Sequence, residues 1–295
     1  MTRETASLNQ QTVSATLSFA APIARRLENA ETEEVLEFLK QRPLHTFVMS
    51  GFIRDNGIVS DCHRGIFYGC RDAGGALEGV ALIGHAIYIE ARSERALREF
   101  ARVASECLTT HLILGEQKMI GPFWKHYAVT GQSPRRVGHE LLLEKTSAEP
   151  AVPALEHLRP ANLDELEVIV SVHAALALEE SGVNPLDRDA TGFRSRCRRR
   201  IEQGRVWVLV TGGELIFKVD VISDTREVIY LEGVYVNPKY RGQGYGSRCL
   251  SQLSRQLLQR TSALTALVNE DKTDALRFFD KVGFARRAVY DTIFL

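Results

Sequence analysis

The feature that most constrains this chain is a run of alternate glycines between a short apolar strand and an apolar helix. Val234 and Val236 alternate as in a half-buried strand, and Pro238 ends that strand. Three glycines then occupy alternate positions: Gly242, Gly244 and Gly246. Leucines at helical spacing follow them: Leu250, Leu253, Leu257 and Leu258. The sequence therefore predicts a strand that enters a glycine loop, and a helix that begins at the end of this loop.

Such a junction is suited to binding an anion. The first backbone N–H groups of a helix have no partner inside it, and the helix dipole adds partial positive charge there. Glycines allow a phosphate to approach the backbone without meeting a Cβ atom, and Arg241 can add a charge-assisted hydrogen bond. The alternative is a glycine-bearing turn that binds nothing, but three alternate glycines are costly for packing alone.

The spacing of the glycines narrows the choice of anion. A Walker loop requires a lysine between the last glycine and the helix, and none is present. A dinucleotide fingerprint requires glycine where Ser247 stands. The run Arg241-Gly-Gln-Gly-Tyr-Gly246 fits Arg-x-x-Gly-x-Gly, and it resembles the acyl-CoA pyrophosphate loop of the GNAT acyltransferases. Asn269-Glu-Asp-Lys-Thr-Asp-Ala-Leu-Arg-Phe-Phe-Asp-Lys-Val-Gly-Phe284 also resembles the closing β–α–β signature of that family, so the resemblance covers residues from about 155 to the end.

The resemblance implies an N-acetyltransferase that uses acyl-CoA, most simply acetyl-CoA, as the acyl donor and needs no metal. It places a backbone N–H of the strand on the acyl carbonyl and the loop on the pyrophosphate. The residues expected to bind the cofactor are Val234, Tyr235, Val236, Arg241, Gly242, Gln243, Gly244, Tyr245, Gly246, Ser247, Asn269 and Phe279. The acceptor is expected to be an amine of a small molecule or a peptide.

Transfer to an amine requires a base, because an alkylamine has a pKa of about 10.4. Glu232 is the candidate, since alternation along the strand predicts that it shares one face with Tyr230 and Val234. The alternative is a solvated or ion-paired glutamate. The resemblance also implies a tyrosine as acid where Phe279 stands, and phenylalanine cannot donate a proton. Tyr235 and Tyr290 are the substitutes considered, each with the alternative of a packing role.

Length and composition set the wider frame. A chain of 295 residues predicts two domains, and 37 basic against 37 acidic residues give no field that would attract nucleic acid or a membrane. Five scattered cysteines without a C-x-x-C pair indicate reduced thiols in a cytoplasmic protein. No signal peptide is apparent, and no metal-ligand spacing occurs. A monomer or a homodimer is expected.

The order of predicted elements repeats. We expect an α/β (α+β) fold of two tandem GNAT-like domains, each a mixed, mostly antiparallel sheet flanked by helices. The predicted parts are a disordered tail (1–25), a degenerate N-terminal domain (26–146), a linker (147–154) and an acyl-CoA-binding domain (155–295). In the first copy, Ile89 is followed by Glu-Ala-Arg-Ser-Glu-Arg without glycine, and Glu94 would repel a pyrophosphate. This domain is not expected to bind acyl-CoA in the usual way.

Four other features have two interpretations each. The carboxylates of segment 179–185 fit an acceptor wall or a solvated helix end, and the arginines of segment 194–200 fit an anion site or a solvated face. Lys218 is predicted to point into a cleft or into solvent, and Cys249 to be an activated thiol or a core residue. The rival to the enzyme is an acyl-CoA-binding sensor or scaffold that has lost turnover, favoured by Phe279 and opposed by Glu232.

Overall fold

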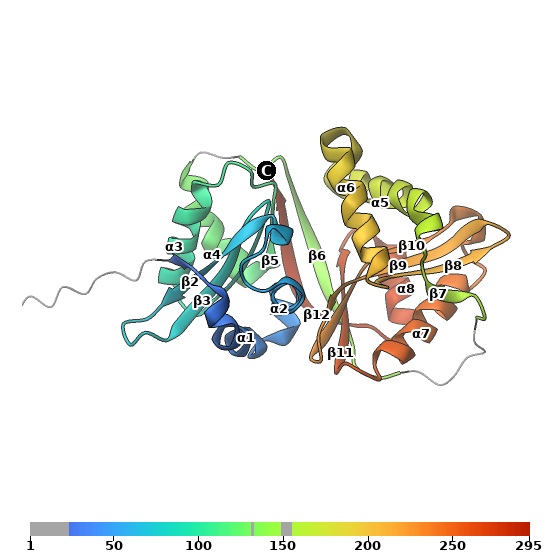
Figure 1. Cartoon of the computed structure of the whole chain (residues 1–295), viewed down its shortest axis with the longest axis horizontal. Coiled ribbons are helices and arrows are strands. Elements are labelled where there is room, and N and C mark those ends of the chain that lie inside the picture. Colours follow the sequence, from blue (N-terminus) through green and yellow to red (C-terminus); the bar gives the residue numbers. More distant parts are fainter. Residues whose placement is uncertain (1–23, 131–132, 149–154) are drawn as a thin grey trace, which may run out of the picture.

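A computed structural model describes residues 24–130, 133–148 and 155–295. Its strands form one 12-stranded sheet in the order β1-β2-β3-β4-β5-β12-β6-β11-β10-β9-β8-β7. Figure 1 shows the N-terminal half on the left and the C-terminal half on the right, with β6 and β12 between them. The predicted α/β fold with a mixed, mostly antiparallel sheet flanked by helices is confirmed.

The N-terminal half contains four helices and six strands among the described residues. Its helices are α1 (Thr32–Lys40), α2 (Pro43–Asn56), α3 (Glu94–Ser105) and α4 (Gln117–Tyr127). Its strands are β1 (Arg25–Arg26), β2 (Gly65–Arg71), β3 (Leu77–Gly84), β4 (Ala86–Ala91), β5 (Leu112–Glu116) and β6 (Arg136–Lys145). Apolar side chains at helical spacing explain α1, which buries Val35, Phe38 and Leu39. Pro43 starts α2 in the first turn, where its missing N–H costs nothing.

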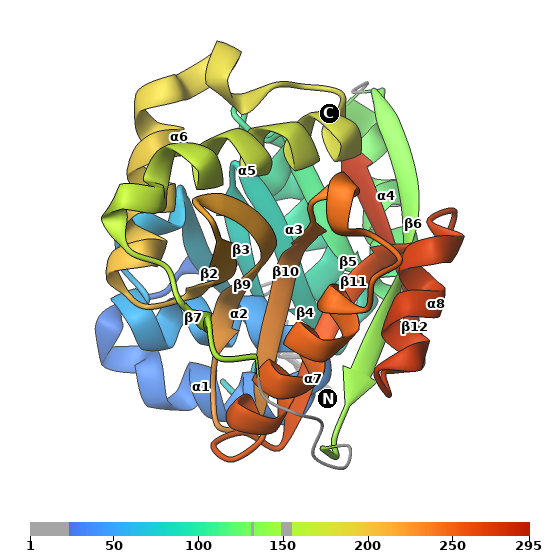
Figure 2. The ribbon, with the colours of Figure 1, turned by 90° about the vertical axis from the view of Figure 1, so that its right-hand side faces the viewer.

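The C-terminal half has the same kinds of element among the described residues. Its helices are α5 (Leu166–Ser181), α6 (Pro185–Glu202), α7 (Tyr245–Leu257) and α8 (Thr273–Lys281). Its strands are β7 (Leu158–Pro160), β8 (Val206–Thr211), β9 (Glu214–Asp224), β10 (Val228–Val236), β11 (Ala263–Asn269) and β12 (Ala285–Phe294). Helices α5 and α6 cover one face of this half, and α7 and α8 cover the other (Figure 2).

The two halves exchange their last strands. Strand β6 of the N-terminal half pairs with β11 and β12, and β12 pairs with β5 of the N-terminal half as well as with β6. The predicted pair of domains implies that each half closes its own sheet with its own last strand. Instead, each strand adds to the sheet of the other half, so the two sheets become continuous.

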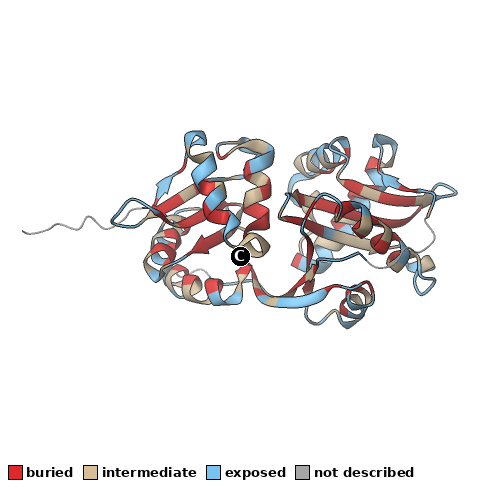
Figure 3. Cartoon of the chain, turned by 90° about the horizontal axis from the view of Figure 1, so that it is seen from below, coloured by how far each residue is buried: buried red, intermediate tan, exposed pale blue. Residues whose placement is uncertain are grey.

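Helix α2 joins the halves on one face of this sheet. Phe47 and Val48 of α2 are buried with Val228 and Tyr230 of β10. The Ser223 hydroxyl donates a hydrogen bond to the Phe47 carbonyl oxygen at 2.6 Å. Figure 3 shows that buried residues run through the strands of both halves. One apolar cluster therefore spans the junction, and the two halves pack as one body.

Some predicted segments lie outside the described residues, and the structure has two strands that the sequence did not predict. Most of the predicted tail (1–25) and most of the linker (147–154) fall outside the described residues. The short edge strands β1 and β7 were not predicted. The described residues contain no helix that is both long and apolar enough to cross a bilayer.

Candidate functional site

The glycine loop has the backbone that its sequence predicted. After β10 a short 3-10 helix, Pro238–Tyr240, leads into an exposed loop, and α7 begins at Tyr245. Gly242 and Gly244 have φ angles of +76° and +82°, and a Cβ added at either would meet nothing within 4 Å. These two glycines are therefore required by backbone conformation, because L residues rarely adopt such φ values.

Gly246 has a different role in the same loop. A Cβ added there would lie 2.9 Å from Val236 Cγ2 and 3.0 Å from the Phe278 ring. The start of α7 therefore rests directly on the end of β10. The N–H groups of the first turn of α7, which have no partner inside the helix, therefore lie near the end of β10.

Side chains of the loop fix its own backbone. Arg241 Nε donates to the Val236 carbonyl at 3.1 Å, and Gln243 Nε2 donates to the Lys239 carbonyl at 3.0 Å. The Tyr240 hydroxyl donates to Glu214 at 2.8 Å. The loop is thus ordered by its own contacts, and the helix dipole places partial positive charge at the first turn of α7.

Strand β10 leaves its neighbour β11 halfway along. The two strands pair in parallel from Val228 to Leu231, and β11 continues to Asn269. On the other side, Glu232 faces Asp220 and Tyr235 faces Lys218, so β10 has one extra residue there. Gly233, with φ +60°, lies in this β-bulge. Among the described residues, no strand consequently pairs with the edge of β10 from residue 234 to residue 236 on the β11 side.

The bulge changes which side chains share a face. Tyr230 lies on the face covered by α2, whereas Val234 and Val236 pack into the cluster beneath α7 with Leu231. The expectation that Val234 shares the face of Tyr230 and Glu232 is therefore wrong, because the extra residue at the bulge reverses the alternation. Tyr235 packs with α5 and α6 instead.

A buried group of charges lies under the bulge. Lys218 and Asp220 have no exposed surface, and their side chains form an ion pair of 3.0 Å. His173 Nε2 of α5 lies 2.6 Å from the Asp220 carboxylate, and Arg200 of α6 lies 3.5 Å from it. Burial opposes ionisation of Asp220, but Lys218 and His173 hold its pKa below the ordinary value. Lys218 therefore points neither into a cleft nor into solvent.

Glu232 is exposed at the mouth of the opening between β10 and β11. The negative charge of Glu232 helps to raise the pKa of two further carboxyl groups. These belong to Glu180, in the last turn of α5, and to Glu140, on β6. Glu180 is exposed as a residue, yet burial of its carboxyl group, followed by repulsion from Glu232 and Glu140, raises its pKa to about 7. The sequence indicated Glu180 only as one carboxylate of segment 179–185, and it gave no sign of Glu140.

The remaining predicted residues lie in three different places. Asn269, at the end of β11, accepts a hydrogen bond from the Asp271 N–H at 2.9 Å. Phe279 is 5% exposed and makes edge contacts with Phe278 and Phe284, so it is a core residue. The Tyr290 hydroxyl lies 3.0 Å from His45 Nδ1 in the N-terminal half, away from the glycine loop.

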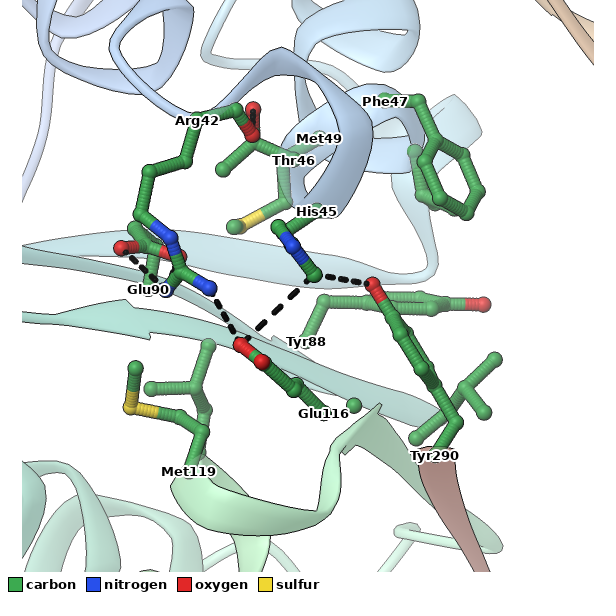
Figure 4. Close-up of a pocket in the computed structure, with 14 residues that line it drawn as sticks. Arg42, His45, Thr46, Phe47, Met49, Tyr88, Glu90, Glu116, Met119 and Tyr290 are labelled. Carbon is green, nitrogen blue, oxygen red and sulfur yellow. Dashed lines mark hydrogen bonds and ion pairs between the residues drawn. The ribbon is translucent and has the colours of Figure 1, made fainter. Parts of the chain in front are cut away.

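The N-terminal half has a corresponding opening, and a charged group fills it. Strands β4 and β5 pair only at Ala86↔Leu112 and Ile87↔Ile113, after which they separate. Figure 4 shows the Arg42 guanidinium between the carboxylates of Glu90 and Glu116, with His45 and Tyr290 beside them. Helix α3 follows with Ser93 as its cap and with no glycine loop. The expectation that this half does not bind acyl-CoA in the usual way stays a prediction.

The burial of Cys249 decides between the two interpretations of this residue, an activated thiol or a core side chain. Cys249 has no exposed surface, and burial raises the pKa of its thiol to about 12, so it is a core residue. Among the described residues, no group of three or more His, Cys, Asp or Glu side chains is arranged to hold a metal ion.

Comparisons with known proteins agree with this geometry. Residues 172–284 match the model of the family described as Acetyltransferase (GNAT) family, and this segment is a GNAT domain. No curated protein matches the sequence significantly.

Solved structures extend the likeness in fold to both halves. A Drosophila protein has 14% identity and a TM-score of 0.66, over 93% of this chain and 99% of that chain. An acetyltransferase of the GNAT family from Colwellia psychrerythraea has 12% identity and a TM-score of 0.53, over 92% and 99%. A tandem GNAT protein from the clavulanic acid biosynthesis pathway has 13% identity and a TM-score of 0.54, over 92% and 97%.

Proposed function

We propose that the C-terminal half transfers an acyl group, most simply acetyl, from acyl-CoA to an amine. The observation that carries this proposal is the separation of β10 from β11 at the Gly233 bulge, directly beside the glycine loop. Within the described part of the chain, the opening leaves the backbone edge at 234–236 without a partner strand on the β11 side, where the thioester arm can bind, and the first turn of α7 offers N–H groups to the pyrophosphate. A single ligand can therefore use both features at once.

The chemistry then requires a neutral amine. Glu232 accepts a proton from the ammonium group of the acceptor, directly or through a water molecule. The amine nitrogen attacks the thioester carbonyl, a C–N bond forms, and the C–S bond breaks. An N–H on the free edge of β10 stabilises the negative charge on the carbonyl oxygen during this step. The second proton of the nitrogen passes to the leaving thiolate, which gives the amide and free CoA.

The tyrosines considered from the sequence do not suit the transfer of this proton to the thiolate. Phe279 has no hydroxyl and packs in the core, and Tyr235 packs with α5 and α6. Tyr290 hydrogen-bonds to His45 in the other half, so we do not assign it this role. Water at the exposed mouth of the opening is the donor that best fits this arrangement.

Phe279 also favours the second candidate, an acyl-CoA-binding sensor or scaffold without turnover. Both candidates predict binding of acetyl-CoA, so thiol release separates them. The purified chain is incubated with acetyl-CoA and a panel of primary amines, and free CoA thiol is followed with a chromogenic disulfide. Release that depends on one class of amine supports the enzyme. Binding without release from any amine supports the sensor, and absence of binding contradicts both.

A further inference from the structure

The buried ammonium group of Lys218 donates a hydrogen bond to the backbone of the strand that borders the opening. Its Nζ atom lies 3.1 Å from the carbonyl oxygen of Gly233, inside the β-bulge of β10. Carbonyl groups of a regular strand are paired with a neighbouring strand, and a bulge interrupts that ladder. A side chain of β9 therefore acts here as the partner of the Gly233 carbonyl.

This bond fixes the direction of the peptide group between Gly233 and Val234. The described residues contain no cis peptide bond, and in a trans peptide the C=O and N–H groups point in opposite directions. Because the Gly233 carbonyl points to Lys218 of β9, the Val234 N–H points away from β9. In the described residues, neither β9 nor β11 has a residue in register with Val234. The N–H is therefore turned toward the edge where the thioester arm is proposed to bind.

A chain of buried charges holds Lys218 in this place. Asp220 Oδ1 lies 3.0 Å from the Lys218 ammonium group, and His173 Nε2 of α5 lies 2.6 Å from the Asp220 carboxylate. Neither Lys218 nor Asp220 has any exposed surface. The position of the ammonium group is thus set by contacts with β9, β10 and, through Asp220, α5.

Stability alone does not account for a buried lysine at this position. A buried ion pair loses the hydration of both charges, and apolar side chains of similar volume often stabilise a fold as well or better. An apolar pair could not, however, donate a hydrogen bond to the Gly233 carbonyl. The feature that a lysine adds here is control over the direction of one peptide group.

We propose that Lys218 is a positioning residue for acyl transfer, which turns the Val234 N–H toward the carbonyl oxygen of the bound thioester. Asp220 and His173 hold Lys218 in place, and the Val234 N–H makes the contact with the substrate. This N–H stabilises the negative charge on the oxygen while the C–N bond forms. The inference rests on the proposed function and adds to it the residues that orient the donor.

The test observes the acyl carbonyl directly, by infrared difference spectroscopy of acetyl-CoA labelled with carbon-13 at that group. A hydrogen bond weakens the C=O bond, so the band should move to lower wavenumber when acetyl-CoA binds to the wild-type chain. Lys218→Met/Asp220→Asn removes the donor to Gly233 without leaving an unpaired carboxylate, and it should abolish this shift. Arg200→Met is the matched control, because it removes a charge 3.5 Å from Asp220 and keeps Lys218. It should retain the wild-type shift.

Affinities give a second readout, which a merely structural role would not produce. S-ethyl-CoA is a thioether that lacks the carbonyl group but keeps the rest of the ligand. In calorimetric titrations, the wild-type chain should bind acetyl-CoA about two- to tenfold more tightly than S-ethyl-CoA. The double variant should bind both alike, with the affinity for S-ethyl-CoA unchanged. With an amine that releases thiol, kcat should fall by about 10²-fold or more in this variant.

A band that does not shift in the wild-type chain, or the same shift in the double variant, would overturn the inference. If the wild-type chain does not bind acetyl-CoA, the proposed function fails, and the inference fails with it. Bound acetyl-CoA with an unshifted band refutes the inference alone. If circular dichroism shows that Lys218→Met/Asp220→Asn does not fold, Lys218→Met/Asp220→Leu takes its place as an apolar pair, with the same expected loss of the shift.

Discussion

The ammonium group of Lys218 donates a hydrogen bond to the carbonyl oxygen of Gly233 at 3.1 Å. This bond joins the buried charges beneath β9 to the bulge of β10, where the strand leaves β11. A Cβ added to Gly233 would lie 2.9 Å from Lys218 Nζ, so the lysine and the glycine require one another. The direction of Glu232 therefore depends on a group that lies wholly inside the protein.

Replacement of Lys218 with methionine should destabilise the fold. The Asp220 carboxylate, which has no exposed surface, would lose its ion pair of 3.0 Å. Removal of one partner from a buried pair typically costs about 3–5 kcal/mol, so urea unfolding should show a loss of this order. Lys239→Met is the control, because the pair of Lys239 with Glu214 is at the surface and should matter by less than about 1 kcal/mol. Equal losses of unfolding free energy in the two variants would show that the buried ion pair stabilises the fold no more than the surface pair does.

Replacement of Glu232 with glutamine should separate catalysis from binding. Loss of a general base lowers the rate by about 10²–10⁴-fold, and we expect a fall of this size in kcat. The affinity for CoA should stay the same, because the loop and α7 are untouched. Glu227→Gln, one residue before the same strand and at a residue paired with Arg54, serves as the control. Full activity in the Glu232 variant would remove Glu232 from the role of base.

Stability should fall in mildly acidic solution because of His85. Burial, and then the charges of Arg64, His111 and Arg196, lower the pKa of His85 to about 4. An unfolded histidine has a pKa of about 6.5, so between pH 6.5 and about 4 the unfolded chain binds a proton here that the folded chain does not. The contribution of neutral His85 is therefore present above pH 6.5 and is lost as the pH falls.

The measurement is the midpoint of urea unfolding at a series of pH values. His85→Gln should flatten the fall in stability between pH 6.5 and 4 compared with the wild-type chain. His111 stacks on His85 at 5.4 Å and also has a lowered pKa because of burial, so part of the slope should remain. A slope that is the same in both chains would contradict the assignment.

Arg42 should matter more for stability than exposed arginines do. Its guanidinium bridges Glu90 and Glu116, whose side chains are 6% and 12% exposed. Arg42→Leu leaves both carboxylates without this partner, and a loss of about 3–5 kcal/mol is expected on thermal or urea unfolding. Arg102→Leu, which breaks surface pairs on α3, should change stability by less than about 1 kcal/mol. If the two variants lose the same unfolding free energy, the bridge from Arg42 to Glu90 and Glu116 contributes no more than a surface ion pair.

Local sequence patterns predicted the positions of most helices and strands. They did not predict which strands pair across the two halves. The bounds of α1 and α8 follow from helical spacing and end signals, and the glycine loop follows from its backbone needs. The exchange of β6 and β12 could not be predicted, because alternation shows which face of a strand is buried but does not identify its neighbours. The family match confirms the resemblance that the loop suggested.

The sequence predicted the part of the candidate site that lies in one stretch of the chain, but it did not predict the residues that come from other segments. The loop residues and Glu232 lie within one continuous stretch, so their spacing is visible in the sequence. Glu140 comes from the other half of the chain, and only the exchange of β6 places it opposite Asn269 of β11. Lys218 alternates with apolar residues and was predicted to point outward, since a single strand does not reveal that Asp220 and His173 compensate its charge.

Calorimetric titration with acetyl-CoA tests the central claim most directly, in the wild-type chain and in Gly244→Val. Gly244 has φ +82° and open space around it, so valine there strains the backbone of the loop by about 1–3 kcal/mol. Gly204→Val is the control, because Gly204 has φ +67° and equally open space in the turn after α6. We predict one acetyl-CoA per chain, an affinity lowered by about tenfold or more in Gly244→Val, and unchanged affinity in Gly204→Val. Absence of binding by the wild-type chain, or equal affinity in all three, would contradict the account.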